Sequence, residues 1–299
     1  MATDRHRASE HNERGRELNA QGRTDEAIRE YLRACEIDPQ WSVPHYNLGL
    51  LYKYAGDWER SLQWNQRAAA LDPADRAGWW NLGIAATALG RWDEARRAWR
   101  GGGVNVPDGD GPIDYPCGRA PIRLDPKGDA EVVWSQRLDP ARAVLENVPL
   151  PDSGFCWRDI VLNDGAPNGY RMLGEREVPV FDCLQLLSPS PYSTFIAMVE
   201  GGEQAEDALA QLAAQRGLGA EDWTSSIEWL CKACSEGRPH GRHDHAPPPR
   251  PGPRRVALAA PRIEAAERLL AEWRAESASI RVVSLELALH ASDRPSYVN

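Results

Sequence analysis

Residues recur at a fixed spacing of 34 along the first third of this 299-residue chain. Four columns keep this step: Gly15, Gly49 and Gly83; Gly22, Gly56 and Gly90; Ala27, Ser61 and Ala95; and Pro39, Pro73 and Pro107. Four independent columns in one register do not arise by chance. A constant period of this length indicates stacked copies of one supersecondary unit, each packing on the next.

The residue types in these columns predict a helix–turn–helix unit. Gly22 and its equivalents fall where a first helix must end, because only glycine enters a left-handed cap without strain. The sequences that follow, such as GDWERS, restart a helix with acidic residues in the first turn. Pro39 and Pro73 stop the second helix. Gly15 and its equivalents lack a side chain where the paired helices must approach closely. We therefore expect six helices between Ala8 and about Trp99.

In these columns the chain resembles the tetratricopeptide repeat (TPR) over about residues 8–107. The resemblance implies a solenoid of three repeats in residues 1–107, whose concave groove binds a peptide or partner protein. It places the groove on the first helix of each repeat, at Asn12, Arg16, Asn19, Tyr46, Leu50, Lys53, Tyr54, Trp80 and Ile84. The alternative for Tyr46, Trp80 and Ile84 is packing between repeats, because apolar stripes at helical spacing usually face a core.

Chaperone-binding TPR proteins hold a carboxylate of their ligand with Lys, Asn and Arg residues at set positions. The corresponding positions of this chain carry Asn12, Arg16, Asn47, Ala77 and Asn81. Only Asn47 matches that pattern. The sequence therefore predicts a groove that is more aromatic than basic and that lacks a chaperone carboxylate clamp.

Charge and hydropathy exclude several classes of function. The formal net charge is 35 − 44 = −9, so no large basic field invites nucleic acid. No run approaches the ~18–20 apolar residues of a membrane span, and the first residues lack the apolar core of a signal peptide. We expect a cytoplasmic protein, whose six cysteines are thiols or metal ligands before they are disulfides.

Beyond the repeats, the sequence predicts a linker at 108–127, rich in Gly, Pro and Asp, and then a small β-barrel at 128–190. The barrel is expected from five short runs at period two: AEVVWSQRL, ARAVLENV, WRDIVLN, GYRML and EVPVFDCLQLL. We interpret NDGAPNG, between the third and fourth runs, as a turn, because Asn and Gly supply positive φ. Five strands joined by tight turns favour an SH3-like or OB-like barrel.

Residues 191–299 predict a ferredoxin-like α/β sandwich. The strands are expected in STFIAMVE, WTSSIEWLC, RRVALAAP and SIRVVSLELAL, and the helices in EQAEDALAQLAAQRG and RIEAAERLLAEWRAE. The order βαββαβ is that of a split βαβ sheet with both helices on one face. A small barrel followed by such a sandwich is similar to bacterial proteins of unassigned function, and that similarity implies no site residues.

A cysteine- and histidine-rich loop at 231–253 is the candidate metal site. It holds Cys231, Cys234, His240, His243 and His245, spaced Cys-x2-Cys-x5-His-x2-His-x-His. Two thiolates at Cys-x2-Cys spacing with imidazole ligands favour a structural Zn²⁺. Five ligands for four positions allow a closed shell. Two alternatives stay open: a solvated loop with Cys231 packed as a small hydrophobe, and a reversible redox pair of Cys231 and Cys234.

No recognisable catalytic motif occurs in the chain, neither a phosphate-binding loop nor a nucleophile elbow nor His-Glu-x-x-His. We therefore predict no catalytic residues and favour a TPR adaptor that binds a protein or peptide, with zinc as its only cofactor. The alternative is a metal-dependent enzyme or metal/redox sensor that its TPR domain recruits to partners. An open, water-bearing metal shell would favour the alternative, and a closed shell the adaptor.

Overall fold

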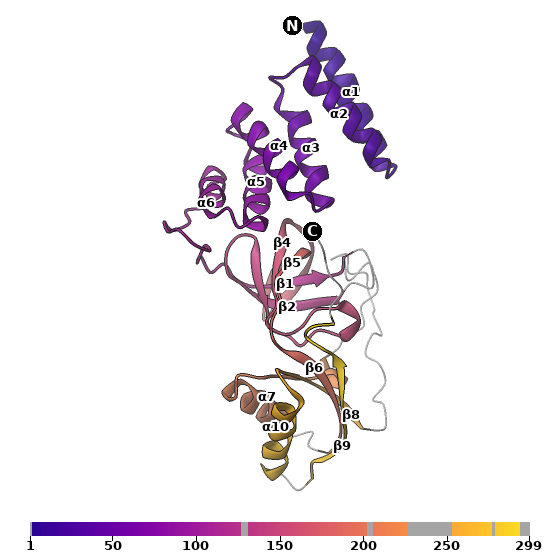
Figure 1. Ribbon diagram of the computed structural model, residues 1–299, viewed down its shortest axis with the longest axis vertical. Helices are drawn as coiled ribbons and strands as arrows, with labels where there is room; N and C mark the ends of the chain where they lie inside the picture. The colour runs from indigo at the N-terminus through magenta and orange to yellow at the C-terminus, as the bar shows by residue number, and fades with distance from the viewer. Residues whose placement is uncertain (1, 127–130, 202–205, 227–252, 277–278, 294–299) are drawn as a thin grey trace. The chain divides into compact units, whose positions relative to one another are not determined.

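The computed structural model describes residues 2–126, 131–201, 206–226, 253–276 and 279–293. Helices make up the first third of the chain, and strands dominate the remainder (Figure 1). The chain divides into two compact units. Of the described residues, unit 1 contains 2–117 and 138–142, and unit 2 contains 118–126, 131–137 and those from 143 onward.

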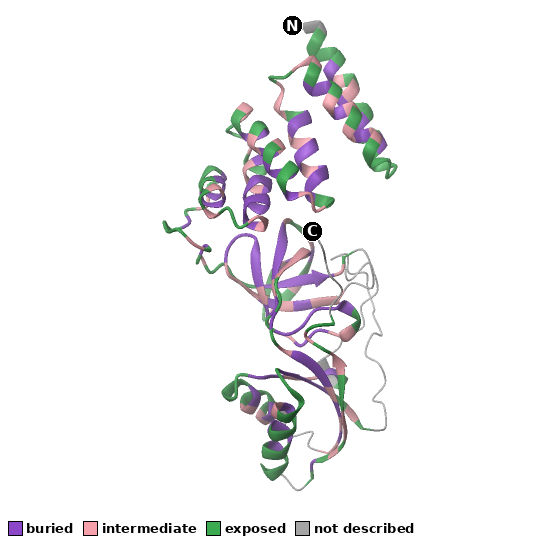
Figure 2. Cartoon of the chain, viewed as in Figure 1, coloured by how far each residue is buried: buried purple, intermediate pink, exposed green. Residues whose placement is uncertain are grey.

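Unit 1 is built from three successive pairs of helices. They are α1 (Ala2–Ala20) with α2 (Thr24–Ile37), α3 (Ser42–Tyr54) with α4 (Trp58–Leu71), and α5 (Arg76–Ala88) with α6 (Trp92–Gly101). The helices of a pair pack together, and each pair packs on the next through α2 with α3 and α4 with α5. Buried residues run along the facing sides of these helices (Figure 2). The six predicted helices are therefore present, with α1 starting at Ala2 rather than near Ala8.

Glycine ends the first helix of each pair as predicted. Gly22, Gly56 and Gly90 have φ of 74°, 73° and 66°, in the left-handed region. The following residue then donates its N–H to a carbonyl five residues back, as Arg23 does to Leu18 at 2.9 Å. This bond satisfies one of the carbonyls that a helix end leaves without a partner.

A second glycine column brings the two helices of each pair into close contact. A Cβ atom added at these positions would meet a buried side chain of the paired helix: Gly15 meets Tyr31 at 2.7 Å, Gly49 meets Asn65 at 2.5 Å and Gly83 meets Trp99 at 2.8 Å. Distances under 3.0 Å are essentially never seen for real Cβ atoms. The large residue on one helix therefore requires the glycine on the other.

In unit 2, five strands close into a barrel in the order β1-β2-β3-β4-β5. They are β1 (Gly118–Leu124), β2 (Glu131–Arg137), β3 (Arg142–Leu145), β4 (Ile160–Leu173) and β5 (Arg176–Ser188), with a 3₁₀ turn, η1 (Pro151–Ser153), before β4. Parallel pairing of β1 with β5 closes the barrel, with Ile122 opposite Phe181. Ile122, Leu145 and Val161 are fully buried in its interior.

Two predictions about this region were wrong. Residues Gly118–Leu124 were assigned to the 108–127 linker but form β1, because five consecutive residues of this segment are buried against the barrel. Pro121 is tolerated there, since it lies opposite Trp134 of β2 and only the two residues that follow it, Ile122 and Arg123, pair with β5. The NDGAPNG segment is not a turn; it lies inside the long strand β4, where register shifts between Asn163 and Tyr170 absorb the extra residues.

A four-stranded sheet follows in the order β7-β8-β6-β9. Its elements are β6 (Ser193–Glu200), α7 (Glu206–Gln215), β7 (Gly219–Asp222), α8 (Trp223–Ser226), β8 (Arg254–Ala260), α10 (Ile263–Glu276) and β9 (Arg281–Leu289). Helices α7 and α10 cover one face of it (Figure 1). On that face Leu209 and Trp273 pack against Phe195 and Leu258.

The strand predicted in WTSSIEWLC was also wrong over its described part. The strand β7 ends at Asp222, and Trp223–Ser226 form the short helix α8. The Asp222 carboxylate accepts the N–H of Thr224 at 2.8 Å, which turns the chain out of the sheet. The Trp223 side chain is buried and donates its indole N–H to the Val148 carbonyl at 3.2 Å.

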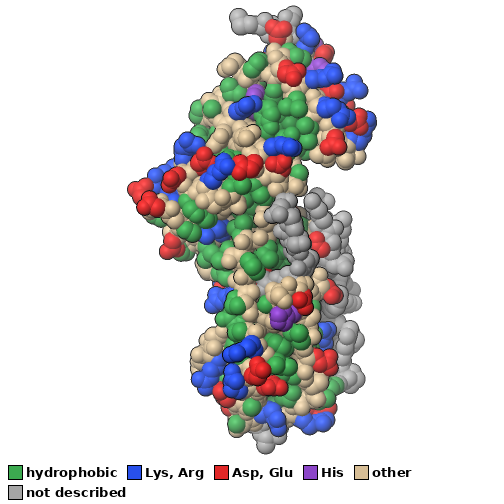
Figure 3. Space-filling model, viewed as in Figure 1, with side chains coloured by type: hydrophobic (Ala, Val, Ile, Leu, Met, Phe, Trp, Pro, Cys, Tyr) green, Lys and Arg blue, Asp and Glu red, His purple; other side chains and the backbone are tan. Residues whose placement is uncertain are grey.

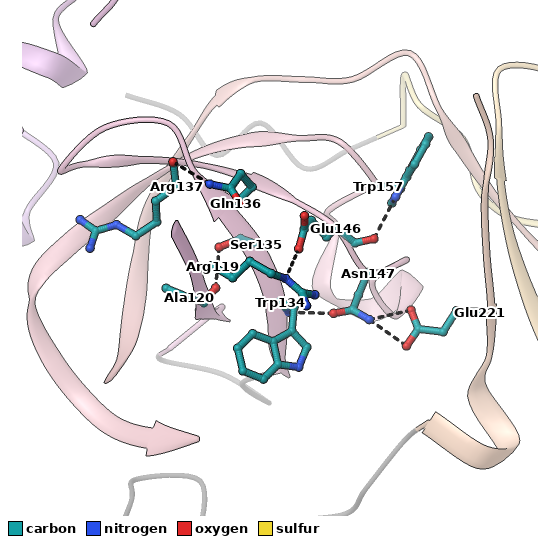
Figure 4. A network of polar contacts seen from close by, with 10 residues as sticks. All are labelled: Arg119, Ala120, Trp134, Ser135, Gln136, Arg137, Glu146, Asn147, Trp157 and Glu221. Carbon is teal, nitrogen blue, oxygen red and sulfur yellow. Dashed lines mark hydrogen bonds and ion pairs between the residues drawn. The ribbon is translucent and has the colours of Figure 1, made fainter. Parts of the chain in front are cut away.

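The other face of this sheet packs on the barrel within unit 2. Ala257 and Ala259 of β8 lie against Val148 and Trp157. The Glu221 carboxylate accepts a hydrogen bond from the Asn147 amide at 3.0 Å (Figure 4). It also accepts one from the Val148 backbone N–H at 3.0 Å. The small alanine side chains of the sheet therefore leave room for bulky side chains of the barrel region. The charge-assisted hydrogen bonds of Glu221 fix the position of the sheet against this region.

Substituting Gly83 by alanine should destabilise unit 1, because Trp99 is fully buried and cannot yield to a new Cβ atom. We expect a loss of about 1–3 kcal/mol in the free energy of unfolding, as for other overpacked cores. Chemical denaturation followed by far-UV circular dichroism would measure it. The control is Gly78→Ala in the same helix, where the nearest atom is 3.4 Å away and the substitution should be neutral or stabilising. Equal effects at both positions would contradict the packing argument.

Candidate functional site

The nine predicted groove residues lie on the first helix of each pair, three on α1, four on α3 and two on α5. They divide by exposure into a buried group and a surface group. Ile84 is 0% exposed, Asn12 2% and Lys53 3%. The prediction that Ile84 lines a ligand groove therefore conflicts with its burial, and its side chain belongs to the helix core.

Trp80 also takes part in packing. Its ring meets the Trp99 ring edge to face, with centroids 5.2 Å apart and planes at 73°. The Trp80 indole nitrogen is buried and has no hydrogen-bond partner among the described residues. The packing alternative thus accounts for Trp80 and Ile84, whereas Tyr46 remains partly exposed.

Hydrogen bonds between buried and partly buried polar side chains connect neighbouring repeats. The Asn47 amide of α3 donates to the Asn12 side-chain carbonyl of α1 at 2.8 Å. The Lys53 ammonium of α3 donates to the Asn81 side-chain carbonyl of α5 at 3.2 Å. Polar groups at these depths are stable only when hydrogen-bonded. These two hydrogen bonds link α1 to α3 and α3 to α5, and they therefore help to fix the spacing of the first helices of the three pairs.

The surface group combines aromatic, aliphatic and charged side chains. Tyr54 is 48% exposed, and the Lys53 ammonium lies over its ring, 4.3 Å from the centroid. Leu50 and Tyr46 are partly exposed on the same helix. Arg16 and Asn19 are exposed on α1, and Arg16 forms an ion pair with Glu13 at 3.0 Å.

A shallow pocket of about 400 Å³ adjoins Tyr46. It is lined by Ser42, Val43, Tyr46, Asp72, Ala74 and Asp75. Val43 is 40% exposed and was missing from the predicted groove. The sequence spacing could have predicted this neighbour, because Val43 and Tyr46 are three residues apart and therefore lie on one side of a helix. Hydrophobic side chains are also visible between charged ones on the face of the helical region drawn in Figure 3.

Two of the described cysteine thiols, Cys35 and Cys183, are not activated for chemistry. Burial raises the pKa of Cys35 and of Cys183 to about 12. Reactive cysteines have lowered pKa values, because the thiolate is the nucleophile. Both thiols therefore stay protonated and act as small hydrophobic side chains.

The five predicted zinc ligands, Cys231, Cys234, His240, His243 and His245, lie outside the described residues. Within the described residues, no three His, Cys, Asp or Glu side chains gather where they could hold a metal ion. The zinc site therefore stays a prediction from the spacing of the five residues.

Comparison with protein families gives one match for this region. The family model described as TPR repeat matches residues 15–55. The N-terminal region is a TPR region. The match covers helices from α1 to α3, and the 34-residue columns extend the same pattern through the second and third TPR repeats.

Solved TPR structures resemble this region weakly. The second TPR of Spaghetti (RPAP3) bound to the HSP90 peptide SRMEEVD is 22% identical, covering 33% of this chain and 93% of its own, with a TM-score of 0.32. The first TPR of the same protein, bound to the same peptide, is 24% identical, covering 33% and 78%, also at 0.32. The Sgt2 TPR domain from Aspergillus fumigatus is 23% identical, covering 32% and 63%, at 0.30. Scores this low carry no ligand over to this chain.

A search of curated proteins finds no match. Across the described residues, no helix combines the length and the apolar character needed to cross a bilayer.

Metal analysis of the full chain, purified without chelators or a His-tag, would test the zinc prediction. We expect close to one zinc per chain in the wild type and its loss in Cys231→Ser/Cys234→Ser, because thiolates at this spacing share one tetrahedral ion. The matched control is Cys117→Ser, an exposed thiol elsewhere in the chain. Wild-type protein without metal would contradict the site.

Glu131 of β2 should make stability depend on pH. Burial raises the pKa of its carboxyl to about 7, the N–H of Leu150 at 3.0 Å opposes this shift, and the nearby Glu221 carboxylate adds to it. A raised carboxyl pKa favours the folded state at low pH, and this contribution is lost as pH rises from about 4.5 through 7. Glu131→Gln should therefore gain stability over wild type across that window, by on the order of 2–3 kcal/mol. Unfolding midpoints of both proteins at several pH values would measure the difference, and parallel pH profiles would contradict it.

Proposed function

We propose that the TPR region binds a peptide or partner protein on the face formed by α1, α3 and α5, and that the protein acts as an adaptor. The main support for this proposal is that Tyr46, Leu50 and Tyr54 form a row of exposed or partly exposed side chains on α3. Aromatic side chains with a polar tip are enriched in protein interfaces, where they bury much area at low entropic cost.

The proposed ligand inserts apolar or aromatic side chains along α3 rather than presenting a terminal carboxylate. Carboxylate recognition needs amides and cations that point to the ligand. In this region the Asn47 amide donates to Asn12, and the Asn81 carbonyl accepts from Lys53. These polar side chains are thus hydrogen-bonded to one another within the protein, which supports the predicted lack of a chaperone carboxylate clamp.

We infer a ferredoxin-like sandwich in unit 2, supported by the strand order β7-β8-β6-β9 and by α7 and α10 sharing one face. We infer a barrel of the SH3-like or OB-like type from its five strands, closed by the pairing of β1 with β5. Unit 2 would present the adaptor's second surface, with zinc as a structural ion and the cytoplasm as the expected location.

The second candidate function is a metal-dependent enzyme or metal/redox sensor recruited by the TPR region. It rests on Cys231 and Cys234 at the spacing of a metal or redox pair. The coordination shell separates the two functions. A metal with an exchangeable water supports an enzyme, and a closed shell of four protein ligands supports the adaptor.

Peptide selection against the full chain, followed by titration calorimetry, would test the proposed groove. Leu50→Ala/Tyr54→Ala should weaken a selected peptide at least tenfold, because it removes the exposed apolar contacts of α3. The HSP90 peptide SRMEEVD should not bind. Tyr170→Ala, a tyrosine of unit 2 with similar exposure (45%), is the matched control and should leave affinity unchanged. Equal affinities for all three proteins would contradict the assignment of the groove to α3.

A further inference from the structure

Strand β9 (Arg281–Leu289) lies at one edge of the four-stranded sheet. It pairs antiparallel with β6 on its inner side, and within the described residues no strand pairs with its outer side. The opposite edge is β7, a strand of only four residues. An edge nine residues long presents a row of backbone N–H and C=O groups that another strand can pair with.

This edge also carries exposed apolar side chains. Val283 is 49% exposed and Leu287 is 50% exposed. Val283 has no partner residue on β6, because the register shifts between Met198 and Val199. The two residues lie symmetrically about Leu285, two positions before and two after it.

We propose that β9 pairs antiparallel with β9 of a second copy of this chain, around a two-fold axis at Leu285. In that register Val283 of each copy stands opposite Leu287 of the other, so the symmetry buries two such pairs. Apolar cross-strand pairs stabilise antiparallel sheets. An interface of this kind is isologous, because the same patch serves both copies.

The polar side chains of β9 also match a second copy of the same strand in this register. Arg281 is already paired with Glu200 of β6. Glu286 would stand opposite Ser284, whose hydroxyl can donate to the carboxylate, and this contact would also occur twice. No like charges face each other in this register, and the exposed apolar residues Val283 and Leu287 meet each other.

Sedimentation equilibrium of the full chain tests the proposal. We expect a concentration-dependent dimer whose dissociation constant rises at least tenfold in Leu287→Lys, because an ammonium would be placed against Val283 of the other copy. The matched control is Met172→Lys on the β4–β5 hairpin, at a side chain that is 59% exposed, which should leave the dimer intact. Far-UV circular dichroism would verify the fold of each variant. A wild-type protein that stays monomeric at all soluble concentrations would overturn the proposal, even if its β9 edge binds a strand of another protein. So would a dimer lost only in Met172→Lys.

Disulfide trapping tests the register separately. Ser284→Cys/Glu286→Cys should give a covalent dimer under mild oxidation on non-reducing gels, because each new thiol faces the other type across the axis and cross-strand Cβ distances allow a disulfide. Each single substitution places no two thiols opposite each other and should behave as wild type. Equal crosslinking by the double variant and wild type would overturn the pairing about Leu285.

Discussion

Close contact between paired helices is the constraint on which the helical region depends. At Gly49 and Gly83 the backbone of one helix lies directly against a buried side chain of the next. Any side chain at these glycines would push the helices apart, and the apolar faces behind them would lose contact. The same contact recurs every 34 residues, so each repeat presents the same surface to its neighbour.

The two kinds of partner for these glycines differ in chemistry. Trp99 fills the third pair with an aromatic ring, whereas Asn65 occupies the equivalent place in the second pair and is fully buried. The Asn65 side-chain NH2 group donates to the Ser61 carbonyl at 2.8 Å, in the adjacent turn of its own helix, whereas the buried Asn65 side-chain oxygen has no partner among the described residues. Shape is thus kept from repeat to repeat while the interior changes from apolar to polar.

Burial also decides which predicted groove residues can meet a ligand. The first helix of each pair contributes to the core and to the outer face, and its residues lie only a third of a turn apart in direction. Ile84 falls on the core side and Tyr54 on the outer side, although both belong to the predicted groove. In unit 2 the same division separates Ala257 and Ala259, packed on the barrel, from their neighbours Val256 and Leu258, packed under the helices.

The sequence alone determined the helical repeats, since glycine at a helix end, proline at a helix exit and a 34-residue period act locally and need no distant partner. It also predicted β6, β8, β9, α7 and α10, because short periodic runs indicate burial on one face. It did not predict β7, which ends at Asp222, just before the strand expected in WTSSIEWLC. Tertiary structure alone decided that Gly118–Leu124 is a strand, since its burial depends on closure of the barrel by β5, which is far away in sequence. It also decided that β4 runs unbroken through NDGAPNG, because pairing with β5 outweighs the local preference of Asn and Gly for a turn.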